Sequence, residues 1–115
     1  MNDDTRRAPR REVADQVPVT DMMAEAVIGR LGNVSETGML MICSVPMTPE
    51  ALYQFRFAIQ GPQGQPVQVD VGAHLLWNEH SNAPGQSWAG FRFLTLSREH
   101  REQLRAWIAE GSSAV

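Results

Sequence analysis

The sequence contains a single cysteine, no lysine and no long apolar run. With Cys43 alone, an intrachain disulfide and a zinc site built from several thiolates are both excluded, so packing must hold the fold. The longest apolar stretch, 38–43, is far below the ~18 residues of a transmembrane helix. No apolar core or cleavage site of a secretory signal peptide follows the first residues. These absences predict a cytoplasmic protein without a membrane span.

Residues for catalysis or metal binding are also missing. The three histidines, His74, His80 and His100, do not form the i, i+4 pair that a helical zinc site requires. No motif pairs a nucleophile with a base, and no two carboxylates form an obvious pair for acid–base chemistry. The sequence therefore predicts neither an enzyme nor a metalloprotein, and no cofactor.

What remains is the composition of one compact globular domain. The chain has 115 residues and a mass of 12.8 kDa, which suits one domain and is too short for two. Apolar residues make up 43% and charged residues 20% of the sequence. These values are near the averages for soluble globular chains, so wholesale disorder and coiled coils are disfavoured.

All ten basic residues are arginines, and they are unevenly distributed. Residues 1–11 hold four arginines against two aspartates, whereas the remaining chain holds six arginines against eleven acidic residues. An acidic domain with one short basic segment is unsuited to general nucleic-acid binding, which needs a basic face. The guanidinium group instead favours bidentate recognition of a small anionic ligand.

The middle of the sequence has the pattern of antiparallel strands. Short apolar or alternating runs are separated by Gly, Pro, Asn and Ser, and helical periodicity is absent there. This pattern predicts six strands near 16–23, 25–32, 38–44, 51–60, 66–77 and 87–94. Turns are expected at 61–66 and 82–85, where Gly and Pro are concentrated.

The period changes near the C-terminus, where one helix is expected. Ser97 is a suitable N-cap, and Leu104, Trp107 and Ile108 share one helical face before Gly111. Six antiparallel strands avoid exposed edges by closing, so an all-β barrel with this helix over one end is predicted. We expect a flexible arginine-rich leader at 1–12, the barrel and helix at 13–110, and a disordered tail at 111–115.

Two motifs resemble those of a known family. The first is Arg6-Arg7-Ala8-Pro9-Arg10-Arg11, which contains Arg-x-x-x-Arg, and the second is Asn33-Val34-Ser35-Glu36-Thr37-Gly38, which contains Asn-x-Ser-x-x-Gly. In this order they resemble the PilZ domain family, and the similarity continues through 75–77 and 89–93 to the final helix. The resemblance implies a six-stranded antiparallel β-barrel that binds the bacterial second messenger cyclic di-GMP.

The resemblance places the arginines of the leader at the ligand. It assigns Arg6 and Arg10 to the Arg-x-x-x-Arg positions, with Arg7 as a flanking contact, while Arg7 and Arg11 form the same motif one residue later. Both registers stay open at the level of sequence. Guanine presents two acceptors, O6 and N7, that arginine reads bidentately, and the ligand carries two phosphodiester charges. The bland alternative is a solvated basic tail without a ligand.

Four residues of the barrel complete the expected ligand site. Asn33 and Ser35 offer short polar groups for a guanine edge, or for a turn between strands. Gly38 permits a positive φ or a close approach of the base. Trp77 is placed either to stack on a guanine or to cover the barrel rim, and the two are equally favoured.

The predicted function is a cyclic di-GMP receptor that orders its leader on binding and signals to an effector protein. The chain is too short to carry an effector domain of its own. The alternative is a PilZ-like adaptor that binds a protein partner without nucleotide. The partner and the process controlled are not readable from the sequence.

Overall fold

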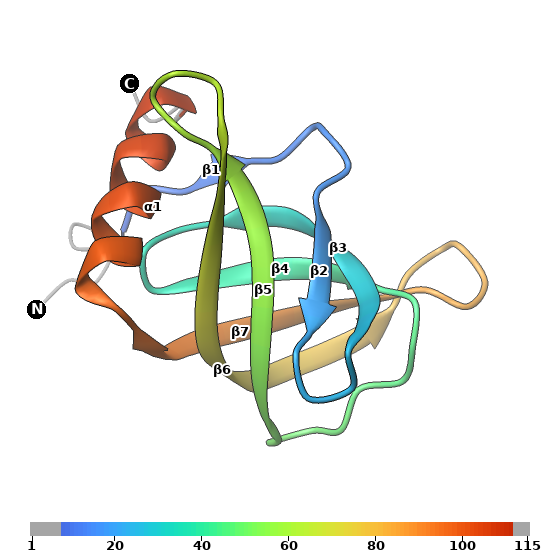
Figure 1. Ribbon diagram of the computed structural model, residues 1–115. Helices are drawn as coiled ribbons and strands as arrows, with labels where there is room; N and C mark the ends of the chain where they lie inside the picture. The colour runs from blue at the N-terminus through green and yellow to red at the C-terminus, as the bar shows by residue number, and fades with distance from the viewer. Residues whose placement is uncertain (1–7, 112–115) are drawn as a thin grey trace, which may run out of the picture.

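The computed structural model describes residues 8–111 and contains seven strands followed by one helix (Figure 1). In chain order the elements are β1 (Arg11–Glu12), β2 (Pro18–Asp21), β3 (Ala26–Val34), β4 (Gly38–Cys43), β5 (Leu52–Gln60), β6 (Pro66–His80), β7 (Ser87–Leu96) and α1 (Arg98–Gly111). All strand pairs are antiparallel. The predicted all-β fold with a C-terminal helix is confirmed.

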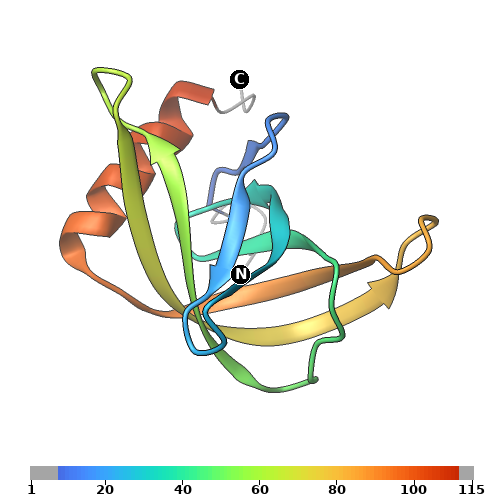
Figure 2. The same cartoon turned by 45° about the vertical axis from the view of Figure 1, so that its right-hand side comes forward.

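Six of the strands close into a barrel. The sheet runs β3-β2-β5-β6-β7-β4, and β4 pairs back onto β3 to complete the ring. The predicted six-stranded antiparallel barrel is therefore confirmed. The short β1 is additional: it lies beside the last residues of β3, on the same edge that β2 occupies further along (Figure 2).

The predicted strands lie close to the observed ones, because the alternation of apolar residues indicates the strands and the turn residues indicate where they end. The burial pattern alternates along β5, where Phe55, Phe57 and Ile59 point inward. The turn after β5 uses Gly64 at a φ of 83°, a conformation that glycine adopts without strain. The strand predicted at 16–23 is shorter, since β2 covers only Pro18–Asp21, and β6 is longer than predicted, since it continues to His80 in a ribbon with β7.

Helix α1 begins where the sequence predicts and covers one end of the barrel. The Ser97 hydroxyl accepts a hydrogen bond from the backbone N–H of His100 at 3.1 Å, which is the capping interaction expected of this residue. Leu104, Trp107 and Ile108 are buried against the barrel core. Packing of this one face fixes the helix over the barrel opening.

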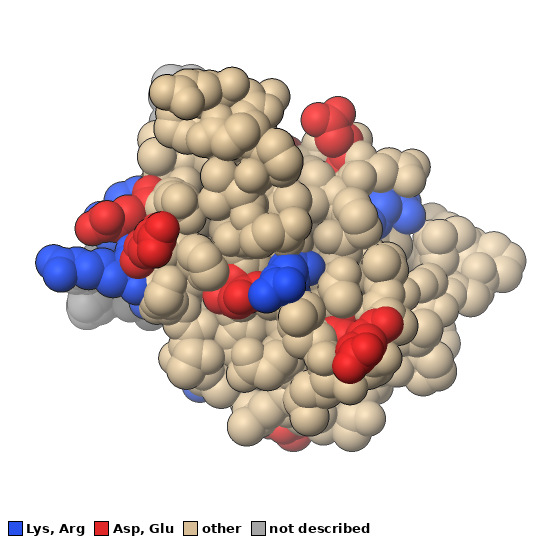
Figure 3. Space-filling view, in the orientation of Figure 1, with Lys and Arg blue, Asp and Glu red and all other residues tan. Residues whose placement is uncertain are grey.

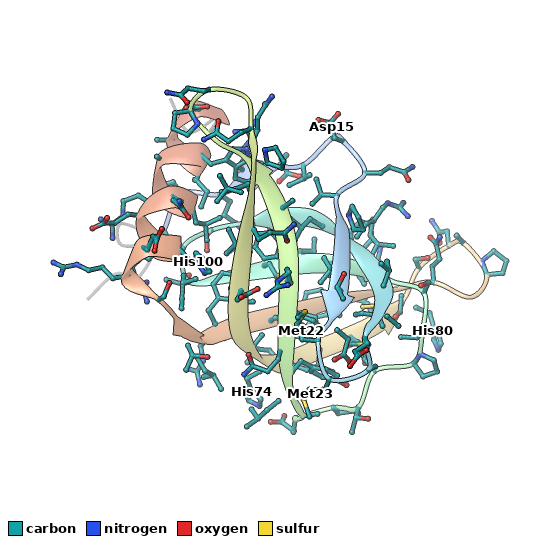
Figure 4. The ribbon with its side chains drawn as sticks, viewed as in Figure 1. Asp15, Met22, Met23, His74, His80 and His100 are labelled. Carbon is teal, nitrogen blue, oxygen red and sulfur yellow. The ribbon has the colours of Figure 1, made fainter. Side chains whose placement is uncertain are left out.

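The histidines lie apart, as Figure 4 shows. His74 contacts Glu50 at 3.0 Å, while His100 Nδ1 accepts a hydrogen bond from the backbone of Asp70 on the α1 side of the barrel. Within residues 8–111, no group of three or more His, Cys, Asp or Glu side chains could hold a metal ion. The same described segment has no helix with the length and apolar character needed to span a membrane.

Some of the predicted features fall outside the described residues. Arg6 and Arg7, together with most of the leader and tail, belong to the segments 1–7 and 112–115. Of the remaining leader, Arg11 and Glu12 form β1, and Gly111 belongs to α1.

Candidate functional site

The two sequence motifs meet at the end of β3. Strand β1 pairs Arg11 with Val34 and Glu12 with Asn33, so the leader runs directly beside the second motif. The side chains follow: Arg10 Nε donates a hydrogen bond to Asn33 Oδ1 at 2.7 Å. Residues 23 positions apart in the chain are thereby joined, and each belongs to a different motif.

Trp77 forms another wall of the same site because of an irregularity in β6. The pairing with β7 shifts between Leu75 and Trp77, which is a β-bulge at Leu76. Leu76 and Trp77 are both exposed, whereas strict alternation would turn one of them inward. The Trp77 indole lies over Gly90 on β7, where a Cβ atom would collide with it. Because Gly90 has no side chain, the indole can pack against the backbone on the outside of the barrel.

Arg10, Asn33 and Trp77 border one open hollow. Its volume is about 340 Å³, at the lower end of the ~300–1,000 Å³ typical of small-molecule sites. The full lining is Arg10, Asn33, Met39, Leu40, Leu76, Trp77, Gly90 and Phe91. Among these described residues Arg10 alone is charged, so the hollow combines apolar walls with one cation. This chemistry suits a flat aromatic ligand that carries acceptors or negative charge.

Ser35 lies close by but is turned into its own loop. It is fully buried, and its hydroxyl accepts hydrogen bonds from the backbone N–H groups of Thr37 and Gly38 at 3.1 and 3.2 Å. The backbone N–H of Ser35 in turn donates to the Gly38 carbonyl at 2.8 Å. In this structure Ser35 shapes the turn that ends β3 and starts β4, and Asn33 alone of the two faces the hollow.

Gly38 is required by packing against a neighbouring strand. It pairs with Arg92 at the start of β4, and a Cβ atom here would collide with the carbonyl oxygen of Phe91. Its φ is not positive, in contrast to Gly64 and Gly85. The close approach expected at this position is therefore made by the backbone of β7.

Arg11 points away from the hollow. Successive residues of an extended strand project to opposite sides, and Arg11 accordingly faces α1 while Arg10 faces Asn33. The guanidinium of Arg11 lies 4.0 Å from the centre of the Trp107 ring, and its Nη1 donates to the Trp107 carbonyl at 2.7 Å. Arg11 thus ties β1 to the helix, whereas its neighbour Arg10 borders the hollow.

Glu36 also makes a contact that the sequence did not predict. Its carboxylate accepts a hydrogen bond from Arg105 Nη2 at 2.9 Å and lies 4.0 Å from Arg101, both on α1. The carboxylate raises the pKa of Arg105 through this hydrogen bond and through its charge. The negative charge in the second motif is therefore directed at the helix, away from the hollow.

Comparison with known proteins identifies the family. The sequence profile of the PilZ domain matches residues 4–110. The chain belongs to the PilZ domain family. No curated protein sequence matches it in a separate search.

A solved structure shares the fold. The chain is similar to the Bacillus subtilis inhibitor of motility MotI/DgrA, with a TM-score of 0.75 at 8% sequence identity. The match covers 90% of this chain and 49% of that protein, so the present chain spans about half its length. PilZ domains are binding and adaptor domains, and the family includes receptors for cyclic di-GMP.

Several residues of the hollow were not predicted from the motifs. Leu40, Leu76 and Phe91 supply apolar walls of the hollow, and Gly90 supports Trp77. The apolar runs around them indicated strands, but nothing local indicated the bulge at Leu76 that exposes two large side chains together. The one available signal was the glycine of the next strand, because a glycine inside a strand often marks close packing.

Proposed function

We propose that this PilZ protein is a cyclic di-GMP receptor whose nucleotide site is the hollow between Arg10, Asn33 and Trp77. The observation that carries the proposal is the 2.7 Å hydrogen bond from Arg10 to Asn33, because it joins the two family motifs at one apolar hollow.

The chemistry of the hollow suits a guanine base. Guanine presents O6 and N7 to a guanidinium, and Arg10 has five N–H donors in a rigid plane. Donation of Nε to Asn33 holds this plane in a defined orientation before the ligand arrives. The indole of Trp77, 45% exposed, offers a face for stacking, which contributes ~1–3 kcal/mol per base.

We place Arg6 with Arg10 as the arginine pair that contacts the ligand, because Arg11 is engaged by Trp107. Binding then orders the leader and presents a changed surface to an effector protein in the cytoplasm. Ser35 and Gly38 support this site by shaping the turn that follows the end of β3, where Asn33 lies.

Calorimetric titration with cyclic di-GMP tests the proposal. The wild type should bind with a Kd of about 1 μM or better, which is about −8 kcal/mol. Arg10→Ala should weaken binding by roughly 1.5–3 kcal/mol, the range for a hydrogen bond to a charged group. Arg98→Ala is the matched control, because Arg98 is almost fully exposed on α1 and only loosely paired with Glu102 at 3.8 Å.

A wild-type protein that takes up no cyclic di-GMP at about 100 μM, some hundredfold above the expected Kd, would show that this member is an adaptor without nucleotide. Equal affinity of the Arg10→Ala and Arg98→Ala variants would move the site away from the hollow.

A further inference from the structure

Helix α1 carries a basic side and an acidic side that adjoin where Arg98 pairs with Glu102 at 3.8 Å. Arg98, Arg101 and Arg105 follow one another at spacings of three and four residues and so share one side. Glu99, Glu102 and Glu110 lie on another side, together with Gln103 and Ala106. The basic side is occupied, since Arg101 and Arg105 both approach Glu36. The acidic side faces the turn between β5 and β6.

An apolar groove lies between this acidic side and the β5–β6 turn. Its volume is about 330 Å³, and its lining is Ile59, Gln60, Gly61, Pro62, Val67, Glu99, Glu102, Gln103, Ala106, Trp107 and Glu110. Figures 1 and 2 both show the turn leaning against the C-terminal half of α1. In Figure 3, carboxylates lie next to arginines at the left over α1, below the uncharged surface of the turn. Among its described lining residues, three are acidic and none is basic.

A buried acceptor without a partner lies next to the groove. The Oε1 atom of Gln103 is buried and has no hydrogen-bond partner within residues 8–111. Because this oxygen has almost no exposed surface, a group in the groove does not reach it. The chemistry of the groove therefore follows from its three glutamates, which attract a positive charge.

We infer that this groove is the docking surface for an effector protein, and that it takes an arginine-bearing segment of that partner. The methylene stem of an arginine can pack on Ile59 and Val67, while its planar guanidinium lies among the glutamates. The inference builds on the proposed receptor–adaptor role by giving the partner's chemistry. It does not require bound nucleotide.

The test measures fluorescence anisotropy of a short fluorescein-labelled peptide of alternating Arg and Leu, at low salt and without cyclic di-GMP. The wild type should bind this peptide and not the matched peptide with Glu in place of Arg. The groove variant should lose about tenfold or more in affinity, as expected when three partly exposed ion pairs are lost. It carries Glu99→Gln, Glu102→Gln and Glu110→Gln.

A second triple variant removes the same charge elsewhere and controls for nonspecific attraction to an acidic protein. Its three carboxylates are exposed or partly exposed and lie outside the groove: Asp15→Asn, Glu25→Gln and Glu79→Gln. The control variant should keep the wild-type affinity within about threefold, well short of the tenfold loss in the groove variant. Equal losses in the two variants would overturn the inference.

Gln103→Met changes the wall of the groove without changing its charge. Removal of an unpaired buried oxygen should keep or raise the melting temperature, and the peptide affinity should stay within about threefold of wild type because the glutamates are unchanged. A loss as large as that of the groove variant would contradict attraction by the glutamates. Sedimentation of wild type and groove variant completes the test: a dimer that only the wild type forms would assign the groove to a second copy of the chain.

The outcomes distinguish this inference from the proposed function. A groove variant that loses the peptide but keeps cyclic di-GMP binding supports docking at α1. A wild type that binds nucleotide but not the arginine peptide overturns the docking surface alone. A wild type that binds the peptide but no nucleotide overturns the receptor role alone.

Discussion

The hollow at Arg10 and the α1 groove are similar in volume but opposite in charge. The hollow has Arg10 among apolar walls, and the groove has three glutamates around an apolar floor. Each is built in a different way. The hollow depends on a strand bulge, on the missing side chain at Gly90 and on a contact between two motifs. The groove results from the periodicity of one helix.

Helix α1 connects the hollow and the groove. Arg11, next to the hollow residue Arg10, contacts Trp107, and Trp107 also lines the groove. Glu36, in the same loop as Asn33, contacts Arg105 on the far side of the helix. Each motif therefore contributes one residue to the hollow and one residue to the attachment of α1.

The largest effect is expected from Gly38→Ala. The added Cβ would meet the backbone of Phe91, which cannot move aside without opening the β4–β7 pairing. We expect a loss of roughly 1–3 kcal/mol or more in the free energy of unfolding, the range for forced overpacking, measured by urea denaturation. Gly32→Ala is a graded control, because its Cβ would meet a side-chain carbon of Trp88 at 3.2 Å and the indole can shift.

The Gly38 result sharpens the account of the hollow. A variant with wild-type stability and no affinity for cyclic di-GMP would show that Gly38 approaches the ligand, and that packing against β7 is secondary.

Arg11→Ala separates the hollow from the helix at a single residue. It removes a charge-assisted hydrogen bond and a cation–π contact with Trp107, so stability should fall by about 1–2 kcal/mol. Cyclic di-GMP affinity at a temperature where the variant is folded should change far less than in Arg10→Ala. Thermal unfolding and calorimetry on the same samples measure both effects. The reverse ranking would assign the arginine motif to Arg7 and Arg11.

The smallest effect concerns Asp70, which belongs to neither region. A hydrogen bond from Arg56 at 2.6 Å, aided by the charges of Arg56 and His100, lowers the pKa of this carboxyl despite its partial burial. Its stabilising contribution is therefore complete above the unfolded pKa near 3.9 and is lost as the pH falls through the lower folded value.

Asp70→Asn should consequently lower the melting temperature by a few degrees at most at pH 7, because the pair is 42% and 45% exposed. Below about pH 4 the difference from wild type should shrink. Melting curves across this pH range measure it. A difference that grows toward acid pH would contradict the contribution of the Arg56–Asp70 ion pair.

Sequence patterns predicted the elements well for a physical reason. Alternation in β5 and the apolar face of α1 are local consequences of burial, and Ser97 caps its helix through neighbours three residues away. The closed barrel followed because six strands with no covered edge had to pair with each other.

The side-chain contacts were less accessible. The direction of the Arg11 side chain depends on the pairing of β1 with β3. A strand of two residues is too short to show a sequence pattern that would predict this pairing. The partners of Glu36 lie up to 69 positions away, so no spacing in its motif indicates them. The sequence allowed Ser35 either to contact a ligand or to shape a turn. Its burial depends on the folded loop around it, which the local sequence does not indicate. Asn33 and Trp77 were assigned to one site, and the structure brings both to the hollow beside Arg10.

The position of β1 has a practical consequence for anyone who shortens this protein. Its two residues continue the edge of β3 beyond the end of β2, and the backbone of Val13 bonds to Gly32 at 3.0 Å. A deletion that stops before Arg10 leaves the pairing of β1 with β3 intact. A deletion that continues through Val13 leaves the last residues of β3 unpaired on this edge and removes the contact of Arg11 with Trp107. Adjacent residues of the leader thus have different surroundings: a substitution at position 10 alters the hollow, and one at position 11 alters the attachment of α1.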